Sequence, residues 1–87
     1  MHYVYILQSK KKNDWLYVGR TRDLKRRFKD HDNGHIRSTK LFAPFKLIYY
    51  EAYLNRKDAS DREYKLKHHG SVIGHLKKRL RNSITEP

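Results

Sequence analysis

The sequence contains no cysteine, which excludes disulfide bonds, thiolate chemistry and zinc sites with cysteine ligands. It also lacks an apolar segment long enough to cross a membrane, and its first residues have neither the basic region nor the apolar stretch of a signal peptide. No repeat, low-complexity tract or linker divides the 87 residues. We therefore expect one domain, residues 1–87, in a cytoplasmic protein without a membrane partner or a small-molecule cofactor.

Acidic residues are scarce. There are 9 of them against 21 lysines and arginines, which gives a net charge of +12. The basic residues are spread from Lys10 to Arg81, so the folded body and not a tail carries the positive field. Such a field attracts polyanions, and nucleic acid is the leading expected partner because phosphate contacts release counterions. An anionic membrane or ribosomal RNA would attract the same charge, and composition alone does not choose among them.

Three segments have the alternating, β-branched and aromatic pattern of strands: residues 2–8, 15–19 and 45–54. The short polar segment 10–14 joins the first two and favours an antiparallel hairpin. Gly19 closes the second strand, where the missing Cβ lets a backbone or a phosphate approach closely.

A first helix is predicted over residues 22–32, with Thr21 as its N-cap and Asn33-Gly34 as its end. Its inward face has the spacing of a helix stripe. This stripe consists of Leu24, Arg27, Phe28 and His31. Two of the four residues are ionisable, and in so small a core a recurring inward polar residue needs a reason.

Two further helices follow the third strand. Asn55 is the expected cap of the first, which runs to about residues 69–70, and Ser71 that of the second. The last helix has an apolar stripe formed by Ile73, Leu76, Leu80 and Ile84. The order of elements is ββαβαα, which predicts an α/β (α+β) fold with a small, mainly antiparallel three-stranded sheet flanked by three helices.

Two tyrosine-rich tripeptides, Tyr3-Val4-Tyr5 and Tyr17-Val18-Gly19, stand a short distance apart in the chain. In order and spacing they resemble the first and second signatures of the GIY-YIG nuclease family. The run from Gly19 to Arg27 resembles the segment that leads to the family's invariant arginine, and residues 62–67 resemble the stretch that holds its metal-binding glutamate. The resemblance covers nearly the whole chain and is strongest to short stand-alone members similar to the N-terminal domain of the excinuclease C subunit.

The chain departs from the family pattern at two positions. Tyr3 stands where the signature has its first glycine, so the first strand is expected to approach a substrate differently. Arg20 stands where several family nucleases have a lysine beside the catalytic tyrosine.

The resemblance implies a metal-dependent endonuclease that hydrolyses phosphodiester bonds in DNA, including structured or damaged DNA, with low sequence specificity. Tyr5 is the favoured proton acceptor, with Tyr17 as its orienting partner. A free phenol has a pKa of about 10, so a nearby cation must assist, and Arg20 is the candidate. The alternative is that both tyrosines only pack in a small core.

Arg27 would bind the non-bridging phosphate oxygens with its planar guanidinium, and otherwise it is one more solvated residue of a basic helix. His31 would hydrogen-bond the phosphate or assist proton transfer, and otherwise it is a histidine favoured by the helix C-terminus. Glu63 would hold a single divalent cation, Mg²⁺ or Mn²⁺, because magnesium often takes only one or two protein carboxylates. Its structural alternative is an ion pair with Arg27. Asn82 either supports the metal site or ends the last helix.

Additional contacts to nucleic acid are expected from polar and basic residues outside this set. They are Ser38, Thr39, Lys40, Lys67, Lys77, Lys78 and Arg81. Two other functions stay open: a non-catalytic DNA- or RNA-binding protein that retains the GIY-YIG fold, and a nuclease subunit whose protein partner supplies target choice.

Overall fold

The computed structural model describes residues 1–86, and three of its segments form one antiparallel sheet in the order β2-β1-β3. The central strand β1 (His2–Ser9) pairs with β2 (Leu16–Thr21) on one side and with β3 (Phe45–Tyr53) on the other. The three predicted strands are therefore confirmed, but Gly19 lies inside β2 and does not end it, because the pairing with β1 continues to Thr21. The tight connection between β1 and β2 brings the two tyrosine-rich segments into register.

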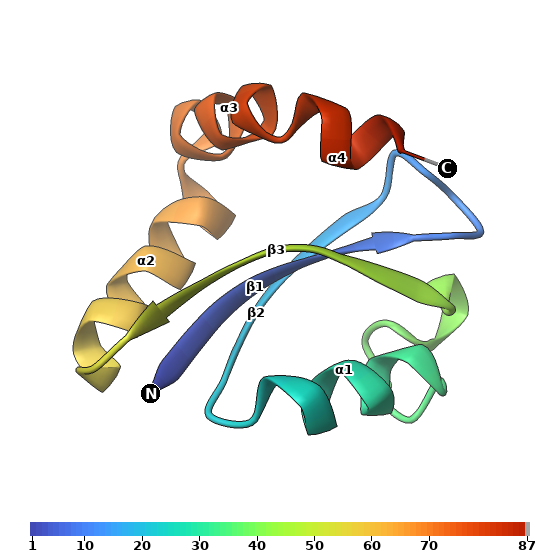
Figure 1. Cartoon of the computed structure of the whole chain (residues 1–87), viewed down its shortest axis with the longest axis horizontal. Coiled ribbons are helices and arrows are strands. Elements are labelled where there is room, and N and C mark those ends of the chain that lie inside the picture. Colours follow the sequence, from blue (N-terminus) through green and yellow to red (C-terminus); the bar gives the residue numbers. More distant parts are fainter. Residues whose placement is uncertain (87) are drawn as a thin grey trace.

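Helices cover both faces of the sheet (Figure 1). Helix α1 (Leu24–Asp32) lies on one face, and the chain returns to β3 through a short 3-10 turn, Lys40–Phe42. On the other face lie α2 (Arg56–His68), α3 (Gly70–Arg79) and α4 (Arg81–Thr85). The α+β class and the order ββαβαα are confirmed, except that the last expected helix is divided in two at Leu80. None of the helices within residues 1–86 is long and apolar enough to span a membrane.

Two apolar clusters sit on the two faces of the sheet, because β1 is buried on both. Toward α1 the fully buried side chains are Tyr5, Leu7 and Phe45. Toward α2 and α3 they are Val4, Ile6, Ala59, Leu66 and Leu76. Alternate residues of β1 thus supply the centre of each cluster, as a period of two requires.

A bulge interrupts the pairing of β1 with β3. Leu7 pairs with Leu47 and Ile6 pairs with Tyr49, which leaves Ile48 unpaired between them. The extra residue shifts the alternation of side chains in β3. As a result Leu47 and Tyr49, although two residues apart, face opposite sides of the sheet.

Two of the expected helix caps are wrong. The N-cap of α1 is Asp23, not Thr21, and its carboxylate accepts a hydrogen bond from the backbone N–H of Arg26 at 3.1 Å. Ser71 does not cap α3, which begins one residue earlier at Gly70 without a capping side chain. Asn55 does cap α2, where its Oδ1 accepts from the backbone N–H of Lys57 at 2.8 Å.

Candidate active site

The ring of Tyr5 lies across the backbone of Gly19, its partner on the adjacent strand. A Cβ added to Gly19 would lie 2.4 Å from both Cζ and the hydroxyl oxygen of Tyr5, and 2.9 Å from Cε2 of Tyr17. The rings of the two tyrosines are 6.4 Å apart. Only glycine fits at this crossing, so the spacing of the two signature segments has a steric reason: it places two phenols side by side over bare backbone.

His31, on α1, joins Tyr5 in a buried hydrogen-bonded chain. Its Nε2 is 2.8 Å from the Tyr5 hydroxyl, and its Nδ1 is 2.8 Å from Oγ1 of Thr39. Burial lowers the pKa of His31 to about 4, and the positive charge of Arg27 adds to this effect. The ring is therefore neutral at pH 7, with one nitrogen donating and the other accepting.

This arrangement corrects the expectation for Thr39. Its side chain is fully buried and its hydroxyl contacts His31, so it does not lie on the surface where it would contact nucleic acid. The His31 ring is likewise fully buried, away from solvent at the helix end.

Tyr5 also differs from what the sequence suggested. Burial raises the pKa of Tyr5 to about 12, and the nearby Tyr17 and Glu63 act in the same direction, whereas the Arg27 guanidinium opposes them. The Tyr5 hydroxyl thus keeps its proton at neutral pH, which is unfavourable for the role of proton acceptor. Tyr17, only partly buried, is the more accessible of the two phenols.

Arg27 lies on the same side of α1 as His31, and its Nε is buried without a hydrogen-bond partner among residues 1–86. The alternative ion pair between Arg27 and Glu63 is not formed. A buried guanidinium nitrogen that lacks a partner is costly, which suggests that a ligand supplies the missing acceptor.

Glu63 reaches the site from α2, which packs on the face of the sheet opposite to α1 and contacts all three strands. Its Oε1 accepts from Nε of Arg20 at 3.2 Å, and its Oε2 accepts from Nζ of Lys67 at 3.1 Å. The ammonium of Lys67 is also 5.6 Å from the centre of the Tyr17 ring. One carboxylate with a 20% exposed side chain is thus held between two cations, beside the accessible phenol.

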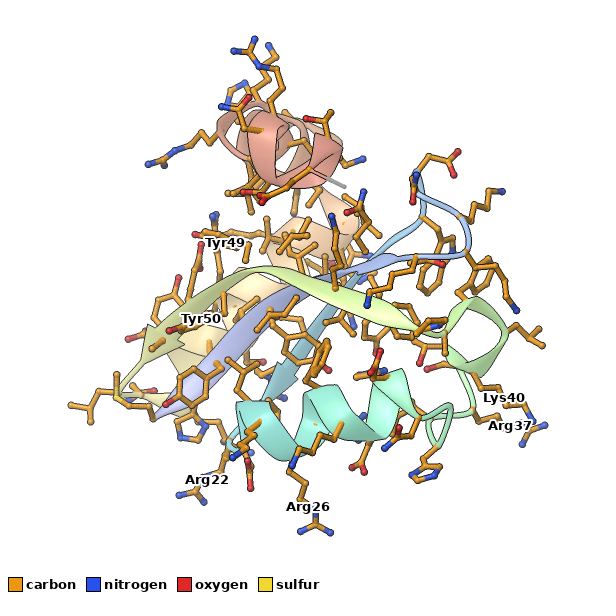
Figure 2. All side chains as sticks on the ribbon, turned by 45° about the vertical axis from the view of Figure 1, so that its right-hand side comes forward. Arg22, Arg26, Arg37, Lys40, Tyr49 and Tyr50 are labelled. Carbon is orange, nitrogen blue, oxygen red and sulfur yellow. The ribbon has the colours of Figure 1, made fainter. Side chains whose placement is uncertain are left out.

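The remaining expected residues lie away from this cluster. Ser38 and Lys40 are exposed in the connection between α1 and β3, and Figure 2 shows Lys40 at the opposite end of α1 from Arg22. Lys77, Lys78, Arg81 and Asn82 are exposed on α3 and α4, across the sheet from α1. The structure therefore does not bring Asn82 or the C-terminal basic residues to Arg27.

Two arginines beside the cluster were not singled out from the sequence. Arg22 and Arg26 line a hollow of about 310 Å³ that also includes Arg27. Figure 2 shows Arg26 extending from the first half of α1 and Arg22 from the connection just before the helix. Arg22 precedes the helix and Arg26 adjoins Arg27 in the chain, so the signal in the sequence is the density of arginines around Arg27 and not a helix spacing.

The fold and this cluster define the class of protein. Residues 1–72 match the model of the GIY-YIG catalytic domain, and the chain belongs to this family. Membership gives it a nuclease-type function with nucleic acid as substrate.

Several similar proteins have names that place them in the UPF0213 group. UPF0213 protein CPE1444 of Clostridium perfringens is 44% identical over 68 residues, covering 77% of this chain and 71% of the relative. UPF0213 protein SSP2268 of Staphylococcus saprophyticus is 37% identical over 67 residues, covering 76% and 79%. The solution NMR structure of UPF0213 protein BH0048 from Bacillus halodurans has a TM-score of 0.57 and 31% identity, covering 98% of this chain and 93% of that one.

Proposed function

We propose that this protein is an endonuclease that hydrolyses phosphodiester bonds in DNA with the help of one divalent cation, Mg²⁺ or Mn²⁺. The observation that carries the proposal is the unpartnered Nε of Arg27 beside the Tyr5–His31 pair, with Glu63 close enough to influence the same phenol. A phosphate group would supply the acceptor that Arg27 lacks. The cations of the site recognise phosphate and not base edges, which supports low sequence specificity.

The donor set fits a weakly held cation. Glu63 is a hard oxygen ligand, and residues 1–86 contain no cluster of three or more metal-ligating side chains. Because magnesium keeps several waters, one carboxylate suffices when substrate phosphate provides another ligand. Arg20 and Lys67 already occupy both Glu63 oxygens, so binding of the cation is expected to depend on the negative charge of the substrate. When bound, the cation would neutralise charge on the phosphate and acidify water.

The side chains of the site would each have a different role in the reaction. Arg27 would orient the phosphate and stabilise the charge that develops on it. Tyr17, partly exposed and next to Lys67, is the better candidate to accept a proton from the attacking water. Tyr5 and neutral His31 would hold the geometry, since their hydrogen bond fixes the Tyr5 ring against Gly19. Arg20 and Lys67 would place Glu63.

Cleavage of labelled duplex, branched and single-stranded oligonucleotides in Mg²⁺ or Mn²⁺ tests the proposal. We expect the wild type to cut, and Arg27→Ala and Glu63→Gln to lose at least about 100-fold in rate. Matched controls are Arg37→Ala, an exposed arginine in the connection between α1 and β3 that lies outside the hollow around Arg27, and Asp61→Asn, an exposed acid on α2. Both controls are expected to retain most of the activity.

Two results would contradict it. Equal cutting by the wild type and both site variants would identify a contaminating nuclease. Salt-sensitive DNA binding that survives Glu63→Gln, without cleavage of duplex, branched or single-stranded DNA, would indicate a non-catalytic binding protein instead. A stable co-purifying protein that restores cutting would show that targeting needs a partner.

A further inference from the structure

Tyr3, which stands in place of the first signature glycine, forms an aromatic pair with Tyr50 of β3. The ring centres are 6.0 Å apart with an interplanar angle of 64°. Tyr50 is 54% exposed although its neighbour on β1, Tyr5, is fully buried. Figure 2 shows Tyr50 on the α1 side of β3, with Tyr49 on the opposite side. The bulge in β3 creates this exposed position.

The pair lines one wall of a groove of about 550 Å³ whose other wall is the start of α1. The groove also contains Arg22, Asp23, Leu24, Lys25 and Leu47. The two basic residues are exposed at its rim, while the one carboxylate, Asp23, caps α1 through the backbone N–H of Arg26. An aromatic wall with a basic rim is complementary to a base attached to its phosphate.

The groove is continuous with the site of the proposed chemistry. Arg22 and Asp23 line both the groove and the hollow that contains Arg27. Tyr3 and Tyr5 are two residues apart on the same side of β1, a separation of about 7 Å along the strand. That distance suits one extended nucleotide next to the phosphate held by Arg27.

We propose that the Tyr3–Tyr50 pair stacks an unpaired base of the nucleotide adjacent to the scissile phosphate. The inference rests on the proposed nuclease function and names its substrate class: DNA with a single-stranded overhang or flap. In a continuous duplex both faces of each base are covered by neighbouring pairs, so an exposed aromatic side chain gains a stacking partner only from an unpaired base.

Fluorescence anisotropy in EDTA, with no divalent cation, tests this step apart from cleavage. For a labelled single-stranded oligonucleotide we expect Tyr50→Ala to bind about tenfold more weakly than wild type, and Tyr50→Phe to bind equally well. Tyr64→Ala, which removes a similarly exposed tyrosine on α2, is the matched control and is expected to have no such effect. Circular dichroism verifies that each variant is folded.

A second arm replaces several nucleotides of the oligonucleotide by abasic ones, which retain the phosphates. The Tyr50→Ala penalty should then disappear, and it should also be absent on a blunt duplex. An equal penalty on abasic and normal strands, or no penalty at all, would overturn the stacking role. Because these measurements contain no metal, they can fail while cleavage succeeds, and they can succeed for a protein that does not cut.

Discussion

Arg62 and Arg27 lie against opposite faces of the same sheet, but their guanidinium groups have very different surroundings. Arg62 donates to Glu51 of β3 from Nε at 3.0 and 3.2 Å and from Nη2 at 2.9 Å. The same carboxylate accepts hydrogen bonds from the hydroxyls of Tyr49 and Tyr53. Arg27, by contrast, has a buried Nε without a partner among residues 1–86.

The pKa values follow this difference. Burial pushes the pKa of Glu51 upward, but the hydrogen bonds from Arg62, Tyr49 and Tyr53 outweigh it and the net pKa is lowered. The pKa of Arg62 is raised by its bonds to Glu51, and burial together with the bond to Glu51 raises that of Tyr53 to about 12. In the Glu51–Arg62 cluster the charged groups have hydrogen-bond partners, and the cluster stabilises the fold. In the cluster around Arg27 a buried hydrogen-bond donor is left for a ligand.

The largest expected difference comes from replacing Arg27 and Arg62 by lysine, which should separate a role in cleavage from a role in stability. Arg27→Lys is expected to cut DNA about 100-fold more slowly at nearly unchanged melting temperature, because lysine keeps the charge but loses the planar fork. Arg62→Lys is expected to lose stability and to keep its cleavage rate at low temperature. Single-turnover kinetics and thermal unfolding of both variants measure this. A loss of stability at Arg27 equal to that at Arg62 would refute the contrast.

Neutralising Glu51 and Glu63 in turn compares how much each carboxylate contributes to stability. Glu51→Gln leaves Arg62 without its counter-charge in a partly buried position, and we expect about 2 kcal/mol of destabilisation, or roughly 10 °C in melting temperature. Glu63→Gln breaks more exposed pairs and should cost no more than about 1 kcal/mol. Urea denaturation gives both free energies. Similar losses would mean that Glu63 is as structural as Glu51.

A third comparison uses one glycine in the sheet, Gly19 of β2, and one in a helix, Gly74 of α3. Gly19→Ala places a Cβ 2.4 Å from the buried ring of Tyr5, and we expect about 1–2 kcal/mol of destabilisation together with lower activity. Gly74→Ala, on α3, meets no atom within 4 Å and should gain about 0.5–1 kcal/mol from helix propensity. A well-tolerated Gly19→Ala would show that the Tyr5 ring moves easily and that the site is not tightly built.

The sequence predicts the positions of side chains on the sheet wherever the local pattern agrees with the packing. The alternation in β1 and the glycine within β2 are enough to place Tyr5 beside Tyr17. The bulge at Ile48 is not predictable in this way, because Leu47, Ile48 and Tyr49 are all apolar and each fits either face. Exposure of Tyr50 depends on that bulge.

Two other features also depend on tertiary contacts. The apolar stripe continues from Leu76 through Leu80 to Ile84, so periodicity gives no sign that the helix divides at Leu80. Thr39 meets His31 only because the chain folds back after α1, and a threonine in a polar loop carries no signal of burial. Glu63 pairs with Arg20 of β2 and not with Arg27, because α2 packs on the face of the sheet opposite to α1.

The last comparison concerns pH, because His31 and Glu51 respond differently to acid. The folded pKa of His31, about 4, is below its ordinary value of 6.5, so the unfolded chain takes up a proton first as pH falls. The contribution of neutral His31 is complete above about pH 6.5 and is lost as pH falls toward 4, by on the order of 3 kcal/mol. The Glu51 carboxylate, with its lowered pKa, stays ionised over most of this range.

Urea denaturation between pH 4 and 7 measures this contribution. His31→Gln should lower stability at pH 7 but flatten the dependence on pH, while His35→Gln, an exposed histidine in the loop after α1, should leave the wild-type slope unchanged. If His31→Gln keeps the full slope, the pH dependence arises elsewhere and the ring is not held neutral between Tyr5 and Thr39. A flattened slope would instead show that the acid sensitivity of the fold arises at His31, on the side of the sheet that faces α1. The Glu51–Arg62 ion pair on the other side has no reason to take up a proton between pH 4 and 7.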